Sequence, residues 1–462
     1  MSAFPLERIT RVNIIFTDDK LNVWYYDTEG VIRSSAINFM TDLPYFLALL
    51  LAFQRFDDSA WGICSAMNQT NSEVTVKMHG PDGKPKLVST SMEESYHIKR
   101  HYGIVGRSTR VLSAKISGDD SDDFVLKIPY PEVFRIAEHD MVIRAKDSAD
   151  NRGYILEHLP ECIASLDLPQ YSTSTIRDAL KVKGKANSGR ILRITAWKRL
   201  RPLTDLVGKE LWKAFWECHR CESTLFACLP SLQAADVRFI GHLHLFKRGL
   251  QHGDISDTNL MYNPVTGKGV LNDFDLAIDV RAPERSVSHR RTGTIPFLSL
   301  DLFHPNGKLD TSVQRKYYHD EESFRWVLVW IITCYRDGRF EPPVDEPIME
   351  WDRLGSTWSQ RKAFIQEATT LKQAARMLAL PEPDRSIRLS AMTMMKQIQT
   401  RGDREETAFY KVLCSEGLEK MSASDLLAPG ANERNPSAEE LLEAIKKDIE
   451  KFEKIPIDMH VK

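Results

Sequence analysis

The chain has 462 residues, of which 42% are hydrophobic and 27% charged, and its formal net charge is −2. This length allows more than one structural unit with a core of its own. The charge gives no basic surplus of the kind that favours nucleic-acid binding. No apolar run reaches the roughly 20 residues of a membrane span, and residues 1–11 lack the apolar stretch of a secretory signal. We therefore expect an intracellular protein, cytoplasmic or nuclear, that binds neither nucleic acid nor membranes.

The chain contains seven cysteines, an odd and scattered set that is typical of a reducing compartment and not of a disulfide framework. One cluster, Cys218-His219-Arg220-Cys221 with Cys228 nearby, has two interpretations. It could hold a metal, or it could be a helix with partly buried thiols. A zinc site needs about four ligands, and no second pair is present, so we favour the helix.

Residues 1–94 are predicted to form an N-terminal extension of short strands and one helix. Strands are expected over residues 12–16 and 21–26, where β-branched and aromatic residues end at Asp and Gly. A helix is expected over residues 43–56, and its apolar run predicts that it is buried. Residues 68–98 are polar, and Gly80-Pro81-Asp82-Gly83 indicates a turn.

The remainder of the chain changes from strands to helices near residue 200. Strands are predicted over residues 110–117, 124–128 and 190–197, with a helix over 132–148. Further helices are predicted over residues 234–248, over 324–334, which is apolar enough to be buried on nearly all sides, and over 437–452, after the capping box that begins at Ser437. Residues 457–462 form a tail.

The loop His252-Gly253-Asp254, followed by Asn259, carries the strongest chemical signal. Phosphoryl transfer needs a carboxylate that orients the attacking hydroxyl and accepts its proton, and it needs oxygen ligands for Mg²⁺. Asp254 suits the first task and Asn259 the second. Residues 259–262 and 269–272 predict a hairpin, which would bring Asn259 close to Asp273 so that both could bind one metal cluster.

Four segments, taken with their order and spacing, resemble the fungal-type protein kinase family. They are His-Gly-Asp-Ile-Ser-x-x-Asn (252–259), Asn-Asp-Phe-Asp-Leu-Ala (272–277), Arg-Thr-Gly-Thr-x-Pro-Phe (291–297) and His-Asp-Glu-Glu-Ser-Phe (319–324). The likeness extends over roughly residues 100–335. It implies an α+β, bilobal protein-kinase-like fold, with a β-rich N-lobe at residues 95–200 and a mainly helical C-lobe at residues 201–456, after the α/β extension.

The resemblance also implies an activity, transfer of the γ-phosphoryl group of ATP to a serine or threonine hydroxyl of a protein substrate, with Mg²⁺. Asp254 would be the catalytic base, Asn259 and Asp273 would hold Mg²⁺, and Lys127 would contact the nucleotide phosphates. The ion-pair partner of Lys127 would be Glu138 or, because the helix register is open, Glu132. The oligomeric state is not indicated.

Other roles follow from the same resemblance. Asp320 would bind the backbone of the catalytic loop. The activation segment would run from Asp273 to about Asp301, which would pair with Arg434. A nucleotide lid, or else an ordinary turn, would lie ahead of the Lys127 strand and would include Gly103, Gly106, Arg107, Ser108 and Val111.

Three positions depart from the usual kinase pattern. Gly253 stands where an arginine is common, Ser256 replaces a lysine, and Asp275 replaces a glycine that can adopt φ > 0. Asp275 predicts a more fixed activation segment or an extra acidic group near the metals. These departures leave two alternatives open, a pseudokinase that acts as a scaffold and a small-molecule kinase.

Overall fold

The computed structural model describes residues 10–91, 93–100, 105–147, 156–182, 189–219, 245–246, 249–279, 293–304, 306–310, 312–313, 315–342, 347–368, 391, 395 and 398. The chain divides into two compact units, the first of residues 1–139 and 160–199 and the second of residues 140–159 and 200–462. The predicted helix over 437–452, and all but residues 245 and 246 of the one over 234–248, lie outside the described residues.

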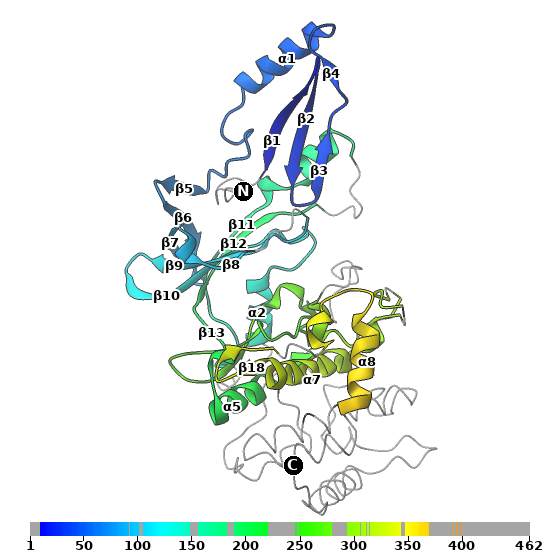
Figure 1. Cartoon of the computed structure of the whole chain (residues 1–462). Helices are drawn as coiled ribbons and strands as arrows, with labels where there is room; N and C mark the ends of the chain where they lie inside the picture. The colour runs from blue at the N-terminus through cyan, green and yellow to red at the C-terminus, as the bar shows by residue number, and fades with distance from the viewer. Residues whose placement is uncertain are drawn as a thin grey trace, which may run out of the picture. The chain divides into compact units, whose positions relative to one another are not determined.

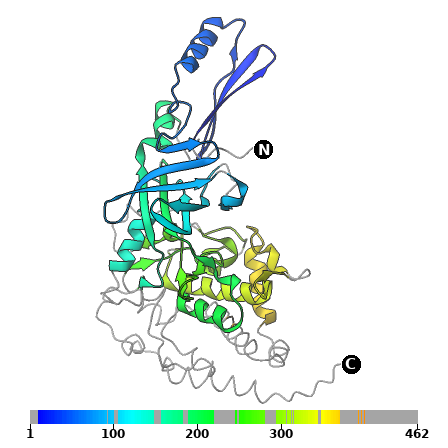
Figure 2. The ribbon, with the colours of Figure 1, turned by 90° about the vertical axis from the view of Figure 1, so that its left-hand side faces the viewer.

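The first unit begins with a four-stranded antiparallel sheet in the order β1-β2-β3, with β4 paired to β2. Its elements are β1 (Arg11–Thr17), β2 (Lys20–Asp27), β3 (Gly30–Arg33), β4 (Ile37–Asn38) and the helix α1 (Leu43–Gln54) that follows them. Figure 2 shows this sheet and α1 together at one end of the unit. The strands and the helix confirm the element types predicted for residues 12–56.

The burial predicted for α1 is wrong. None of its described side chains is buried, and Tyr45 is 73% exposed and Leu47 53% exposed. The helix contacts the two-residue strand β4, which offers little surface to cover it (Figure 1). The sequence therefore predicted correctly that a helix forms here. Whether the helix is buried depends on a covering surface, which this small sheet does not provide.

A second, larger sheet closes on itself. Its strands are β5 (Met67–Thr70), β6 (Glu73–His79), β7 (Pro85–Ser91), β8 (His97–Arg100), β9 (Arg110–Ile116), β10 (Asp119–Ile128), β11 (Cys162–Leu168) and β12 (Leu192–Lys198). The order β10-β12-β11-β6-β7-β9 returns to β10 through a β9–β10 pairing, so these strands form a barrel-like ring. Met78, Leu112 and Ile194 fill its core and are fully buried.

The predicted boundary at residues 94 and 95 falls between strands of this one sheet. The hairpin β6–β7 surrounds the predicted turn at residues 80–83, and it pairs with β9 on one side and with β11 on the other. Residues assigned to the extension thus share a core with strands assigned to the N-lobe. The lobe boundaries themselves stay a prediction.

The helix predicted over residues 132–148 is shorter, because α2 spans Glu138–Asp147. The residues before it are not helical, since Glu132 forms an isolated bridge with Arg190 and a turn follows, in which the Arg135 amide donates to the Glu132 carbonyl at 3.0 Å. All but the first two residues of α2 belong to the second unit, whereas α4 (Ser174–Ala179), between β11 and β12, belongs to the first.

In the described part of the second unit, helices contain more residues than strands do. Its elements include β13 (Arg201–Pro202), α5 (Gly208–His219), β14 (Leu250–Gln251), β15 (Leu260–Tyr262), β16 (Gly269–Leu271), β17 (Ile278–Asp279), α7 (Tyr317–Cys334), β18 (Tyr335–Arg336), β19 (Arg339–Phe340) and α8 (Thr357–Ala368). Helix α7 is buried along most of its length, which confirms the burial predicted for residues 324–334. Cys218 is a buried thiol in α5, whereas Cys221 and Cys228 lie outside the described residues.

Among the described residues, no helix combines the length and the apolar content that a membrane span requires.

One buried histidine predicts how the second unit responds to acid. The Nδ1 atom of His158 is 2.6 Å from the Gly269 carbonyl oxygen, and the His158 carbonyl accepts the Leu271 amide. Burial lowers the pKa of His158, against a smaller opposite effect of the Gly269 bond. As the pH falls, the unfolded chain therefore takes up this proton before the folded chain does.

We expect His158 to make the protein less stable as the pH falls through about 6.5, the usual pKa of histidine. The measurement is the urea midpoint of the wild type and of His158→Gln between about pH 7.5 and about pH 5.5. The variant should lose less stability over this range, because the carboxylate contributions are common to both proteins. Equal slopes would contradict this expectation.

Candidate active site

The predicted hairpin around residues 263–267 is present and positions two of the candidate site residues. Strands β15 and β16 pair with Leu260 opposite Leu271. The Asn272 amide donates to the Asn259 carbonyl at 2.9 Å. Asn259 and Asp273 therefore both lie at the open end of one hairpin, Asn259 directly before β15 and Asp273 two residues after β16.

Asp254 is buried, and its carboxylate is held on one side by Thr294. The Thr294 main-chain amide and its hydroxyl both donate to Oδ1 of Asp254, each at 2.9 Å. No described residue donates a hydrogen bond to the other oxygen, Oδ2. The carboxylate therefore has a fixed orientation and one oxygen available for a proton. Thr294 belongs to the Arg-Thr-Gly-Thr-x-Pro-Phe motif at residues 291–297, but the motif does not predict this contact.

Asn259 and His252 stabilise the conformation of the loop. The amide nitrogen Nδ2 of Asn259 donates to the Asp254 carbonyl at 2.8 Å, which leaves its Oδ1 as an acceptor. Nδ1 of His252 accepts the Asp254 amide at 3.3 Å, and Nε2 lies 3.0 Å from the Asn272 carbonyl. This set of partners requires a neutral imidazole with its proton on Nε2.

A carboxylate on α7 binds the backbone of the same loop, as the resemblance implied. The Gly253 amide donates to Oδ2 of Asp320 at 3.0 Å, and Asp320 is fully buried. Its other oxygen, Oδ1, is 3.3 Å from Nε of Arg315. The hydrogen bond from Gly253 attaches the loop to the core helix of the unit, and Arg315 places a positive charge beside the buried carboxylate.

The geometry at residue 253 explains why glycine occupies it. Gly253 has φ +79°, and a Cβ atom there would lie 2.9 Å from the Leu276 carbonyl oxygen. A larger residue would therefore have to adopt an unfavourable backbone conformation and also displace backbone. Gly253 is thus a requirement of this loop, and the guanidinium next to it comes from Arg315.

We predict that Gly253→Ala destabilises the protein more than Gly267→Ala does. Gly267 also has positive φ, but nothing lies within 4 Å of the position that a Cβ atom would take there. Both variants should lose about 1–2 kcal/mol for a left-handed alanine, and Gly253→Ala should lose about 1–3 kcal/mol more for the backbone contact. Urea unfolding of the two variants measures the difference, and equal losses would contradict the assigned close contact.

In the Asp273-Phe274-Asp275 segment, the positive φ falls on the first aspartate and not on the second. Asp273 adopts the left-handed conformation, with φ +64°, and residues Phe274–Leu276 form a 3₁₀ turn after it. Asp275 has no positive φ, so the aspartate does not need the geometry that a glycine would allow here. The turn starts after Asp273 and leaves residue 275 in an ordinary conformation. A carboxylate oxygen of Asp275 lies within 4.8 Å of one of Asp273.

Two buried side chains hold the segment that follows Thr294. Glu322 on α7 accepts the Ser299 hydroxyl at 2.7 Å and the Leu300 amide at 2.8 Å. Arg361 on α8 donates through Nη1 to the carbonyls of Pro296, at 3.0 Å, and Leu298, at 2.6 Å. Sequence reasoning assigned no role to either side chain.

Arg361 is fully buried, and burial lowers its pKa. Its guanidinium carbon lies 4.9 Å from the centre of the Trp326 ring and 5.3 Å from that of Phe303. Carbonyl oxygens and aromatic faces thus surround the cation. The pair implied between Asp301 and Arg434 stays a prediction, since Arg434 lies outside the described residues.

We predict that Arg361→Met loosens residues 296–298, because two carbonyls lose their donor. Hydrogen exchange of the amides at residues 293–300 should accelerate, while exchange in the β15–β16 hairpin should not change. Arg361→Lys keeps a positive donor and should show a smaller effect. Exchange of residues 293–300 at the wild-type rate in Arg361→Met would show that Arg361 does not hold this segment.

In the first unit, Lys127 is paired with Glu138. Nζ of Lys127 lies 2.7 Å from Oε2 of Glu138, and both side chains are buried. Glu132, the alternative partner, instead bonds to Arg135 at 2.6 Å and lies 3.6 Å from Arg190. The open helix register is thereby resolved in favour of Glu138.

Most of the predicted lid lies within the described residues, although Gly103 does not. Gly106 has φ +131° and Ser108 has φ +45°. The Arg107 carbonyl accepts the Tyr130 amide at 2.7 Å. Val111 lies in β9, opposite Lys127 in β10. The lid residues therefore lead directly into the β-hairpin that carries the lysine.

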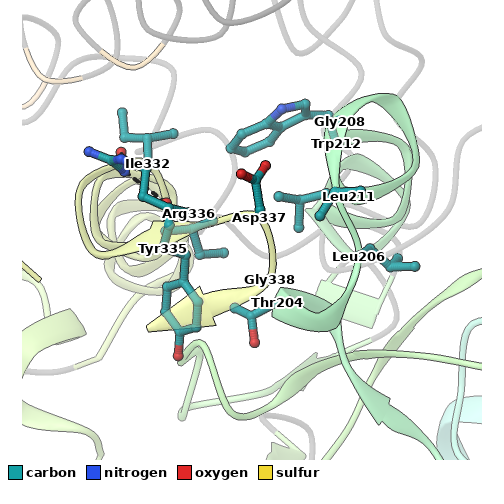
Figure 3. Close-up of a pocket in the computed structure, with 12 residues that line it drawn as sticks. Thr204, Leu206, Gly208, Leu211, Trp212, Ile332, Tyr335, Arg336, Asp337 and Gly338 are labelled. Atoms are coloured by element: carbon teal, nitrogen blue, oxygen red, sulfur yellow. Dashed lines mark hydrogen bonds between the residues drawn. The ribbon is translucent and has the colours of Figure 1, made fainter. Parts of the chain in front are cut away.

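A small pocket in the second unit lies between the start of α5 and the end of α7 (Figure 3). It has a volume of about 140 Å³. Its walls include Leu211, Trp212 and Ile332, and its polar groups include Thr204 and Asp337. A cavity of this size can accept one group about as large as benzene.

Tyr335, which also lines the pocket, connects it to the loop that contains Asp254 and Asp257. Its hydroxyl donates to Oδ2 of Asp257 at a long 3.5 Å. Burial, and secondarily Asp257, raises the pKa of Tyr335 to about 12. The hydroxyl therefore stays protonated as a donor to the loop.

Known proteins share features with this chain at the level of family and of structure. A family described as fungal protein kinase matches residues 8–212 and 223–332. No curated protein matches the sequence significantly. Among solved structures, the chain is similar to the kinase PK-1 of Cydia pomonella granulovirus, with 14% identity and a TM-score of 0.33, over 70% of this chain and 93% of that chain.

Proposed function

The chain belongs to the fungal protein kinase family, whose fold is α+β and whose members are phosphotransferases, and we propose that it is a protein serine/threonine kinase that uses ATP and Mg²⁺. The reaction would transfer the γ-phosphoryl group of ATP to a hydroxyl of a protein substrate. The proposed N-lobe covers residues 95–200 and the proposed C-lobe residues 201–456.

The observation that carries this proposal is the state of the Asp254 carboxylate. Thr294 occupies Oδ1 with two hydrogen bonds, and this orients Oδ2 as the acceptor. A general base needs an acceptor atom within hydrogen-bond reach of the hydroxyl it deprotonates. Since Thr294 belongs to the segment held by Glu322 and Arg361, that segment fixes the orientation of the base.

The metal-binding residues proposed are Asn259 and Asp273, and their donor atoms fit Mg²⁺. Asn259 has its Nδ2 engaged with the Asp254 carbonyl, so the oxygen that a hard cation prefers is the free end of the amide. The nearby carboxylate of Asp275 adds a further anionic oxygen. When bound, Mg²⁺ would neutralise charge on the phosphate oxygens.

Lys127 is proposed to contact the nucleotide phosphates. Its pair with Glu138 supports this role, because a buried lysine held at 2.7 Å has a fixed ammonium position. Gly106, Arg107, Ser108 and Val111, with Gly103, would form the lid over the nucleotide.

A protein is favoured as the substrate over a small molecule. The pocket beside α5 and α7 is large enough for a single side chain, and Tyr335 connects it to Asp257, in the loop that contains Asp254. A polypeptide can fill such a pocket while it presents a hydroxyl elsewhere. Ser256, which is fully buried and bonded to Thr258 at 3.1 Å, does not supply the cation that a lysine would, and for this reason the pseudokinase alternative needs a direct test.

The test is transfer of radiolabelled phosphate from ATP to mixed protein substrates, with Asp254→Ala as the inactive control. A thermal-shift titration with ATP and Mg²⁺ should stabilise the wild type more than Asp273→Asn. Binding of Mg-ATP without transfer would favour the pseudokinase, and transfer to small hydroxyl compounds alone would favour the other alternative.

We predict that Thr294→Val lowers kcat by about 10- to 100-fold, because a base out of alignment loses much of its advantage. Thr294→Ser keeps the hydroxyl and should retain most activity. The main-chain amide bond to Asp254 is available in both variants. The KM for ATP should change little in either, and equal kcat values for the two variants would argue against the orienting role of the hydroxyl.

A further inference from the structure

The lid residues of the first unit contact the turn between β2 and β3. The Gly106 amide donates to the Thr28 carbonyl at 2.9 Å. A side-chain atom of Val105 comes within 3.9 Å of the position that a Cβ atom on Gly30 would occupy. An amide at the centre of the lid is therefore bound to the N-terminal sheet, and not to the barrel-like sheet that carries Lys127.

The β2–β3 turn is itself closed by Asp27. Oδ1 of Asp27 accepts the amides of Glu29, at 2.8 Å, and Gly30, at 3.1 Å. Gly30 has φ +137°, a conformation that side chains rarely allow. The turn therefore has one defined shape, which places the Thr28 carbonyl where Gly106 meets it.

Arg177, on α4, attaches this turn to the rest of the unit. Its Nε donates to Oδ2 of Asp27 at 2.8 Å and its Nη2 to Oδ1 at 2.6 Å, which is a bidentate pair. The same Nε lies 3.3 Å from Oε2 of Glu29. The Arg177 side chain is 8% exposed and that of Asp27 is fully buried, so water weakens this pair little.

A second chain of bonds leads from the turn to the other side of the lid. Thr173 donates its hydroxyl to Glu29 at 2.8 Å and accepts the Arg190 amide at 2.8 Å. Nη1 of Arg190 donates to the Tyr130 carbonyl at 2.8 Å. The Tyr130 amide, in turn, donates to the Arg107 carbonyl at 2.7 Å. Together with the bond from Gly106 to Thr28, these hydrogen bonds form a closed circuit. The circuit holds the lid at two adjacent residues, Gly106 and Arg107.

We propose that the N-terminal sheet positions the nucleotide lid through this circuit. Arg177 is the positioning residue, because it attaches the β2–β3 turn of that sheet to α4. The inference rests on the proposed function, since it assigns nucleotide binding to the lid. A glycine-containing lid that is already ordered loses less conformational freedom when it closes on a nucleotide. The circuit therefore strengthens ATP binding without touching ATP.

The experiment compares Arg177→Met with Arg193→Met in the full chain. Arg193 is a matched control, because it is a buried arginine of the same unit that bonds to Asp167 at 3.0 Å and takes no part in the circuit. Two readouts are taken, hydrogen exchange of residues 105–109 in the protein without nucleotide, and the dissociation constant of ATP with Mg²⁺ by calorimetry.

In Arg177→Met, exchange of the Gly106 amide should accelerate and the dissociation constant should rise about fivefold to tenfold. Arg193→Met should change neither. Thr173→Val, which breaks the second chain of bonds without removing a cation from the Asp27 carboxylate, should act in the same direction with a smaller effect, and it tests the proposal if Arg177→Met does not fold.

Unchanged exchange of Gly106, or unchanged or tighter ATP binding in Arg177→Met and Thr173→Val, would overturn the proposal. The failure of the proposed function has a different signature. If the wild type bound no ATP, the proposal of kinase activity would be refuted. The exchange of the Gly106 amide would still report whether the circuit holds these residues.

Discussion

The second unit depends on a buried helix that carries carboxylates. Asp320 and Glu322 lie near the start of α7, both fully buried, where an anion is tolerated only with donors around it. Asp320 satisfies this need with the Gly253 amide and Arg315, and Glu322 does so with Ser299, Leu300 and Trp326. Each carboxylate therefore binds a separate segment to one rigid element. The two segments meet where Thr294 binds Asp254.

Because the segments have this common support, the orientation of Asp254 is a property of the core and not of the loop alone. Arg361 is linked to the same group of residues, since its guanidinium lies against the ring of Trp326, and the Trp326 indole nitrogen donates to Glu322. The helices α7 and α8 thus approach the segment at residues 296–300 with charges of opposite sign. Two departures from the usual kinase pattern fit this backbone. Gly253 is required by its positive φ and its close approach to Leu276, and Asp275 has no positive φ that would favour a glycine.

The parts of the site that could be predicted from the sequence are mostly those formed by residues that lie close together in the chain. Turn residues at positions 263–267 predicted a hairpin, and a hairpin places Asn259 beside Asp273 whatever surrounds it. The resemblance added Asp320, because its motif specifies a long-range contact directly. The contacts of Arg361, Glu322 and Arg177 could not be predicted, since each acts on residues far away in the chain and no local pattern marks them. The exposure of α1 escaped prediction for a related reason, as hydropathy describes the helix and not the surface available to cover it.

The barrel-like ring also determines where this chain can be shortened. The strands β6 and β7 close the ring by joining β9 to β11. A protein that started at residue 95 would therefore leave β11 without its β6 partner, and would leave β9 unpaired over Ala114–Ile116, beyond the residues that pair with β8. Exposed edges of this kind pair with other chains, and Val76 and Met78 would take their share of the core with them. Expression trials of this chain would therefore do better to begin ahead of β6 than at the first residue of the kinase motifs, because the sheet then keeps its closing strands.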